Sequence, residues 1–230
     1  LWVTSAFSKP IAPIIKHWAI RLNEYCLDLK KEAITPSQWQ QEISKLYKEI
    51  ELEDILKFID FEALQKGFEY PDLGVNTKMV KFPKLTGLPP RTVFIKKVFG
   101  MKENRAIIPH GHSNMASSHL IIKGSLHLRQ YEKIRQDNQH LIIKPTVDKK
   151  NIGVGKSSSI SDEKNNIHWF IANTKTAFTF DVIMLNLNEQ PYDIHNIDIF
   201  EKQKLSNGLL RVPMLDVETA LKKYGKCMHH

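Results

Sequence analysis

The sequence is poor in cysteine, with only Cys26 and Cys227 among its 230 residues. Two cysteines are too few for the disulfide framework of a small secreted protein, and neither has the Cys-x-x-Cys spacing of a zinc site. Neither lies near the histidine-rich segments described below. The sequence therefore gives no support for a disulfide-stapled fold or for a cysteine-bound zinc ion.

Long apolar runs and basic tracts are also missing. No segment approaches the roughly 20 apolar residues of a membrane-spanning helix, so we expect no membrane partner. The formal net charge is +8, but the lysines are scattered and often adjoin acids, as in Lys30-Lys31-Glu32. Without an arginine-rich tract or interleaved aromatic residues, this charge predicts a solvated surface and no nucleic-acid partner.

The two ends of the sequence bear on the cellular location of the protein and on whether it carries a purification tag. The first residue is Leu1, which indicates that the N-terminus has been processed or trimmed. We expect a cytoplasmic protein, with an exported form as the alternative if a signal peptide preceded Leu1. His229 and His230 are either native or part of a purification tag, and the site prediction leaves them out.

Residues 1–67 predict a small α-helical layer. Apolar residues recur at helical spacing in three segments, which cover residues 13–32, 35–50 and 52–66. Thr35 and Gln38 have the spacing of a capping box, with Pro36 in the first turn. The apolar stripes are one-sided, so we expect this layer to pack on the rest of the chain.

The remainder of the sequence has a different character. Residues 68–91 are rich in proline and glycine and predict a linker or an extended wrap. Residues 92–230 predict a β-barrel or sandwich that ends in a short helix at 216–224. The expected strands cover residues 92–99, 105–108, 119–123, 126–134, 141–145, 152–154, 167–172 and 178–187. Residues 156–161 are rich in serine and predict a mobile loop.

The histidines point to a metal. His110 and His112 are separated by one residue, which puts both imidazoles on the same face of an extended segment. Such a pair forms half of a transition-metal site and needs at least one further ligand. Six of the ten histidines lie between His110 and His168. His168, in a second strand-like run, is the best candidate for the third ligand.

These motifs resemble those of the cupins, and most closely those of the cysteamine dioxygenase and plant cysteine oxidase family. The similarity covers about a third of the chain. It rests on His110-x-His112, Met115, Gly124-Ser125-Leu126-His127, Tyr131, Asn166-Ile167-His168, Ala172 and Asp181-Val182. The resemblance implies a mainly β, cupin-type double-stranded β-helix barrel behind the helical layer. It also implies that His110, His112 and His168 bind one ferrous iron, with zinc, nickel and manganese as alternatives.

Further residues follow from the resemblance. Asp181 and Tyr192 match an acid and a tyrosine that shape the family's site, although the spacing to Tyr192 is longer here. Many cupins have a glutamate ligand five residues after the second histidine, where this sequence has Ser117. A three-histidine iron site is therefore expected, in preference to a manganese site.

His119 has two interpretations. It either approaches the metal as a fourth ligand or lines the barrel with a hydrogen-bonded partner, and we expect the second. His127 is expected to support or pack against the site, and Trp169 to face away from it.

The resemblance implies a thiol dioxygenase that uses O2 to oxidise a thiol to a sulfinate. A small aminothiol, a mercapto acid and a peptide with an N-terminal cysteine are all candidate substrates. Arg129 is the only arginine inside the motifs, so we expect substrates without an obligatory carboxylate. The alternatives are another metal-dependent cupin enzyme, acting on a small carboxylate or oxygenated substrate, and a non-catalytic ligand-binding cupin.

Overall fold

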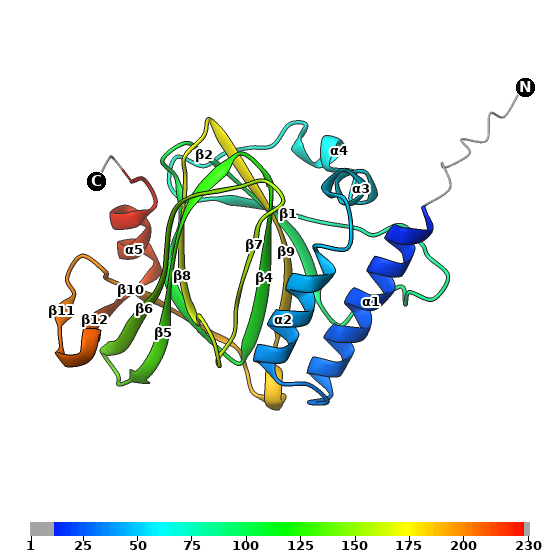
Figure 1. Ribbon diagram of the computed structural model, residues 1–230. Coiled ribbons are helices and arrows are strands. Elements are labelled where there is room, and N and C mark those ends of the chain that lie inside the picture. Colours follow the sequence, from blue (N-terminus) through cyan, green and yellow to red (C-terminus); the bar gives the residue numbers. More distant parts are fainter. Residues whose placement is uncertain (1–11, 228–230) are drawn as a thin grey trace, which may run out of the picture.

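The computed structural model describes residues 12–227, which form two packed antiparallel sheets flanked by helices (Figure 1). The first sheet has five strands in the order β1-β2-β9-β4-β7, and the second has seven in the order β10-β3-β8-β5-β6-β12-β11. The strands are β1 (Asn76–Met79), β2 (Ile95–Lys102), β3 (Ala106–Ser113), β4 (Met115–Lys123), β5 (Ser125–Gln136), β6 (His140–Gly153), β7 (Ser157–Ile160), β8 (Ile167–Ala172), β9 (Thr176–Leu185), β10 (Asp193–Ile197), β11 (Gln203–Lys204) and β12 (Leu210–Leu215).

The eight strands from β2 to β9 have jelly-roll topology. Strands β2, β9, β4 and β7 lie side by side in the first sheet, and β3, β8, β5 and β6 lie side by side in the second. Every pairing among them is antiparallel. This order is that of a double-sheet roll of eight strands, the architecture that cupins share. The predicted cupin-type, mainly β fold is therefore confirmed.

The helices of the N-terminal layer cover the outer face of the five-stranded sheet (Figure 1). They are α1 (Pro13–Lys30), α2 (Pro36–Leu46), α3 (Leu52–Phe58) and α4 (Phe61–Gln65). The predicted capping box is present at the start of α2, where the Gln38 backbone N–H donates to Thr35 Oγ1 at 3.2 Å and Thr35 N–H donates to Gln38 Oε1 at 2.8 Å. Trp18 of α1 packs against Phe180 of β9, with ring centroids 6.5 Å apart.

Several predicted elements differ from the structure. The single helix expected over residues 52–66 is two short helices, because Asp60 adopts a left-handed conformation (φ 51°) and caps α4. The two strands expected at 141–145 and 152–154 are one long strand, β6. The serine-rich segment expected as a mobile loop contains β7, which pairs with β4. Strand β1 lies within the expected linker, and β10 to β12 follow Tyr192, where no strand was predicted. Leu1 and the rest of residues 1–11, together with His229 and His230, lie outside the described residues.

Successive side chains along the strands of the five-stranded sheet point alternately toward the helices and into the barrel interior. On β9, Phe180 and Val182 pack with the helices, whereas Asp181 and Ile183 line an internal cavity. One end of the interior is filled by apolar side chains, including Ile121 and Phe170. The other end remains open, and the predicted metal ligands lie there.

The outer face of the seven-stranded sheet is covered by α5 (Val217–Tyr224) and by the C-terminal segment. Trp169 of β8 packs there against Tyr224, with ring centroids 5.3 Å apart. Its predicted orientation away from the histidines is confirmed. Within residues 12–227, no helix has both the length and the apolar character needed to cross a membrane.

Candidate metal centre

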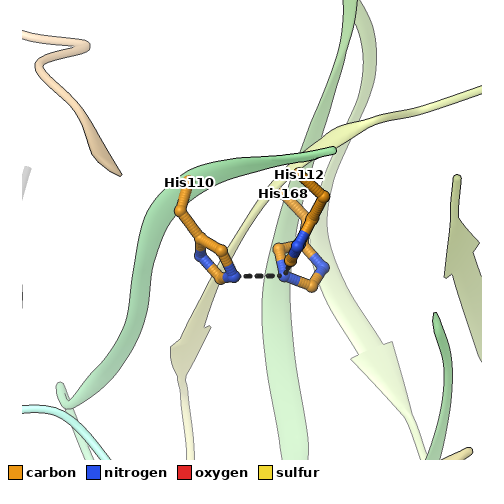
Figure 2. Close-up of side chains that lie close together, drawn as sticks. All are labelled: His110, His112 and His168. Carbon is orange, nitrogen blue, oxygen red and sulfur yellow. Dashed lines mark hydrogen bonds between the residues drawn. The ribbon is translucent and has the colours of Figure 1, made fainter. Parts of the chain in front are cut away.

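Three imidazoles converge at the open end of the barrel. His110 and His112 project from β3 and His168 from β8, and their side chains point toward one another (Figure 2). The distance between His168 Nε2 and His110 Nε2 is 3.1 Å, and that between His168 Nε2 and His112 Nε2 is 3.5 Å. One ligand atom from each residue lies within 4.8 Å of the others. The structure thus brings together the three residues that the sequence motifs singled out.

The strand register explains the convergence. His110 and His168 are direct partners in the antiparallel β3–β8 pair, so their side chains share a face of the sheet. His112 shares this face because it follows two residues later. The register shifts between Ile107 and His110, as it does at a β-bulge. Such bulges re-aim side chains, and this one lies immediately before the first ligand.

Hydrogen bonds select the tautomers of the first two histidines. His110 Nδ1 lies 2.6 Å from the Ile108 carbonyl oxygen, to which it donates as N–H. His112 Nδ1 donates in the same way to Met115 Sδ at 2.9 Å. With the proton on Nδ1, each Nε2 carries a free lone pair that faces the centre. This is the arrangement a metal-binding histidine requires.

Burial keeps the three imidazoles neutral. Loss of solvation lowers the pKa of His110 to about 4 and lowers the pKa values of His112 and His168 well below the usual range. The proximity of the other imidazoles lowers them further, because like charges repel. Neutral imidazole is the form that binds metal ions, so the site is competent for binding near neutral pH.

The separations fit a shared ion. Two nitrogens about 2.1 Å from one metal, at angles between 90° and 109°, lie roughly 3.0 to 3.4 Å apart. The observed separations of 3.1 and 3.5 Å agree with this range. In the described residues, the group contains no carboxylate and no thiolate. Three neutral nitrogen ligands suit iron, zinc, nickel and copper better than the hard cations calcium and magnesium.

A cavity of about 220 Å³ adjoins the three histidines. Its walls are mainly apolar. The apolar lining residues are Ile95, Phe99, Ile107, Met115, Ile183, Leu185 and Ile194, and the polar ones are Lys97, Ser117, His119, Asp181 and Tyr192. A small molecule in this cavity would contact the metal on one side and both kinds of wall on the other.

His119 pairs with Asp181 beside the triad. These residues are direct partners across β4 and β9, and His119 Nδ1 donates to Asp181 Oδ2 at 2.6 Å. The His119 ring lies 4.7 Å from the His168 ring, yet His119 is not part of the three-residue ligand group. It lines the cavity and has a hydrogen-bonded partner, as the second interpretation of this residue requires. Both residues are buried.

The other residues named by the motifs lie at different distances from the centre. Tyr192 is at the cavity mouth and is 45% exposed. His127 points away from the cavity and donates through Nε2 to Asp148 Oδ1 at 2.5 Å. Arg129 lies over the Trp169 ring, with its guanidinium carbon 4.5 Å from the ring centroid, on the outer face of the sheet. Neither His127 nor Arg129 contributes to the cavity.

Two contributions were not predicted from the sequence. Asn166 belongs to a recognised motif, but nothing in the motif shows that its amide holds the backbone of His112. Lys97 is the only lysine or arginine lining the cavity among the described residues. It follows another lysine, so the alternation of the strand does not reveal which of the two points inward.

The comparisons with known proteins found partial similarities to solved structures and no match in sequence. No protein-family model matches the sequence, and no curated protein matches it. Procruciferin, an 11S globulin from Brassica napus, is 11% identical, with a TM-score of 0.38 over 56% of this chain and 29% of its own. KdgF from Halomonas sp. is 11% identical, with a TM-score of 0.36 over 52% of this chain and 87% of its own. A recombinant oxalate oxidase in complex with glycolate is 12% identical, with a TM-score of 0.37 over 54% and 55% of the respective chains. Similarity at this level identifies neither a family nor an activity.

Proposed function

We propose that the protein is a non-haem iron thiol dioxygenase, with Fe(II) bound by His110, His112 and His168. The reaction is RSH + O2 → RSO2H. Two S–O bonds form, the O–O bond breaks, and the thiol sulfur loses the four electrons that dioxygen gains. No further reductant or oxidant is needed. The substrate is a thiol small enough for the 220 Å³ cavity.

The observation that carries this proposal is the ligand set. Three neutral imidazoles would hold the ion, and Ser117 stands where many cupins have a glutamate ligand. Without a ligand of negative charge, the ion keeps its full positive charge, which favours binding of a thiolate over a thiol. Iron in such a site supplies electron transfer between bound sulfur and dioxygen, which amino-acid side chains do not provide.

The chain's own residues position and shield the reactants. The apolar walls, among them Phe99, Ile183 and Leu185, limit the access of water to the sulfur. Three lining residues, Ser117, His119 and Asp181, each have one buried polar atom without a partner among the described residues. A bound molecule that hydrogen-bonds with these atoms would be oriented toward the metal.

Asp181 and Tyr192 have separate roles in this proposal. Asp181 holds the His119 ring through Nδ1 and thereby directs His119 Nε2. Tyr192 lies at the mouth, where its hydroxyl can contact the part of the substrate that extends from the cavity. Asp181 is thus a positioning residue, and Tyr192 a contact for the bound substrate.

A second candidate function follows from the same His119–Asp181 pair. A buried histidine held by a carboxylate resembles the acid–base pairs of metal enzymes that do no redox chemistry. With zinc, nickel or manganese in place of iron, the site would suit proton transfer on a small oxygenated or carboxylate substrate. A cupin that only binds such a ligand is the remaining alternative.

Oxygen uptake by the iron-loaded protein distinguishes these functions. Cysteamine, cysteine, 3-mercaptopropionate and a peptide with an N-terminal cysteine are supplied in turn, with the His168→Ala protein as control. We expect at least one thiol to consume O2 and to yield a sulfinate carrying two atoms of ¹⁸O from labelled dioxygen. If no thiol raises oxygen uptake above the control and no sulfinate is detected by mass spectrometry, the dioxygenase proposal fails.

A further inference from the structure

Lys97 lines the cavity, in a row of polar residues on the five-stranded sheet. It is the direct partner of Asp181 across β2 and β9, and Asp181 is the direct partner of His119 across β9 and β4. Direct partners in antiparallel strands share a face of the sheet. The row Lys97–Asp181–His119 therefore faces the cavity, opposite the strands that carry the three histidines.

The Lys97 ammonium group has no acidic partner. Among the described residues, no carboxylate oxygen lies within 4.0 Å of it, although Asp181 is on the adjacent strand. Asp181 Oδ2 accepts the bond from His119 instead. Lys97 is partly buried and lines a mainly apolar cavity, so its charge is available to a ligand of opposite charge.

The neighbouring lysine has a different environment. Lys96 points to the helical side of the sheet, where its Nζ donates to Thr92 Oγ1 at 2.6 Å. Its ammonium group also lies 5.0 Å from the ring centroids of Phe82 and Phe94. Contacts within the protein thus account for the position of the Lys96 ammonium group, whereas Lys97 has no contact of this kind with residues 12–227.

The spacing suits a small molecule with two functional groups. Adjacent strands lie about 4.8 Å apart, so the Cα atoms of Lys97 and His119 are separated by roughly 10 Å across two strand spacings. The His119 ring is 4.7 Å from that of His168. The Lys97 and His119 side chains both line the same cavity as the three histidines. A thiol whose sulfur lies at the three histidines would therefore present a group two or three bonds away to the lysine.

We propose that Lys97 binds the carboxylate of the substrate, which makes small mercapto acids the preferred class. This inference rests on the proposed function of the three-histidine centre. It differs from the expectation of a substrate without an obligatory carboxylate, which rested on Arg129 being the only arginine inside the motifs. Aminothiols lack the anion, and a peptide with an N-terminal cysteine has its carboxylate too far from the sulfur.

Binding to the cobalt-loaded protein tests this subsite without oxygen chemistry. Co(II) takes up the same ligands, and thiolate coordination adds a charge-transfer absorption band. The probes are 3-mercaptopropionate, cysteamine and 1-propanethiol, which share a short carbon chain and differ in end charge. We expect the wild-type protein to bind 3-mercaptopropionate at least about tenfold more tightly than the other two.

Lys97→Met should remove this preference, and Lys97→Arg should restore part of it. Lys96→Met is the matched control, since it removes the same charge from the neighbouring residue on the opposite face. Equal affinities of the wild-type protein for the three probes would overturn the inference, as would an unchanged preference in Lys97→Met. Absence of a thiolate band with every probe would overturn it as well. A protein that binds 3-mercaptopropionate through Lys97 but forms no sulfinate would contradict the proposed reaction alone.

Discussion

The side-chain amide of Asn166 holds both backbone groups of His112. Asn166 Oδ1 accepts from His112 N–H at 3.0 Å, and Asn166 Nδ2 donates to the His112 carbonyl oxygen at 3.0 Å. The same Nδ2 group donates to the Ser161 carbonyl oxygen at 3.2 Å. Ser161 Oγ in turn donates to Gln40 Oε1 of α2 at 2.7 Å. A candidate metal ligand on β3 is thus connected to the helical layer through two amide side chains.

Replacing Asn166 with alanine should weaken metal binding. The backbone of His112 would lose two buried hydrogen bonds, and the ligand would lose its fixed position. Loss of such supporting contacts typically lowers metal affinity by about 10- to 100-fold. The measurement is competition with a chromophoric chelator. Asn173→Ala is the control, because Asn173 follows the other end of β8 and donates to the Lys150 carbonyl oxygen in an exposed position. Equal effects of the two substitutions would contradict this role.

The three ligands and His119 should behave differently on substitution. His110→Ala, His112→Ala and His168→Ala should each abolish stoichiometric metal binding. His119→Ala should retain the metal with altered affinity, because His119 is outside the ligand group. The check is elemental analysis of protein purified without a histidine tag. Metal retained by all three ligand variants would refute the three-histidine centre, and complete loss in His119→Ala would make it a fourth ligand.

Gly111, between the first two ligands, should not tolerate a side chain. A Cβ at this position would lie 2.8 Å from Ile167 Cγ1 and 3.0 Å from Asn166 Oδ1. We expect Gly111→Ala to lower the free energy of unfolding by about 1–3 kcal/mol through overpacking, and to weaken metal binding by displacing Asn166. Urea denaturation measures the first effect. Gly153→Ala is the control, because a Cβ there meets no atom within 4 Å. A smaller loss in Gly111→Ala than in the control would be inconsistent with this packing.

The metal-free protein should lose stability as the pH falls from about 6.5 to about 4. In this window the histidines protonate in the unfolded chain, whereas burial holds the pKa of His110 at about 4 and holds the pKa values of His112 and His168 well below their usual range. The unfolded state binds more protons, so the free energy of unfolding decreases by up to about 1.4 kcal/mol per pH unit for each histidine. Urea denaturation at about pH 7, 6 and 5 measures this slope. The slope should be shallower in His110→Gln, and an identical slope would argue against the effect.

Part of the candidate centre could be predicted from the sequence because its first two histidines are only two positions apart. The His-x-His spacing on a strand fixes two side chains on one face, and His168 lies in a strand with clear apolar character. The capping box of α2 was likewise predictable, because it depends on residues three positions apart.

The remaining features depend on contacts that are distant in the sequence. Strand β7 contains mostly serine and has no apolar alternation, so only its pairing with β4 identifies it. Two consecutive lysines follow Ile95, the first residue of β2, and the register with β9 is needed to show which one lines the cavity. The two hydrogen bonds between the Asn166 side-chain amide and the His112 backbone join residues 54 positions apart. None of these relationships produces a recognisable pattern among neighbouring residues of the sequence.

Strand β7 ends the five-stranded sheet, yet side chains occupy its outer edge. Gln130 Nε2 donates to the Ser159 carbonyl oxygen at 3.0 Å, and Gln40 Nε2 donates to Ser159 Oγ at 3.1 Å. An exposed strand edge is a template on which a second chain can add by β-pairing. Gln130 occupies a backbone acceptor that an added strand would need, and Gln40 places helix α2 beside the same edge. We therefore expect Gln130 and helix α2 together to hinder edge-to-edge pairing of this sheet.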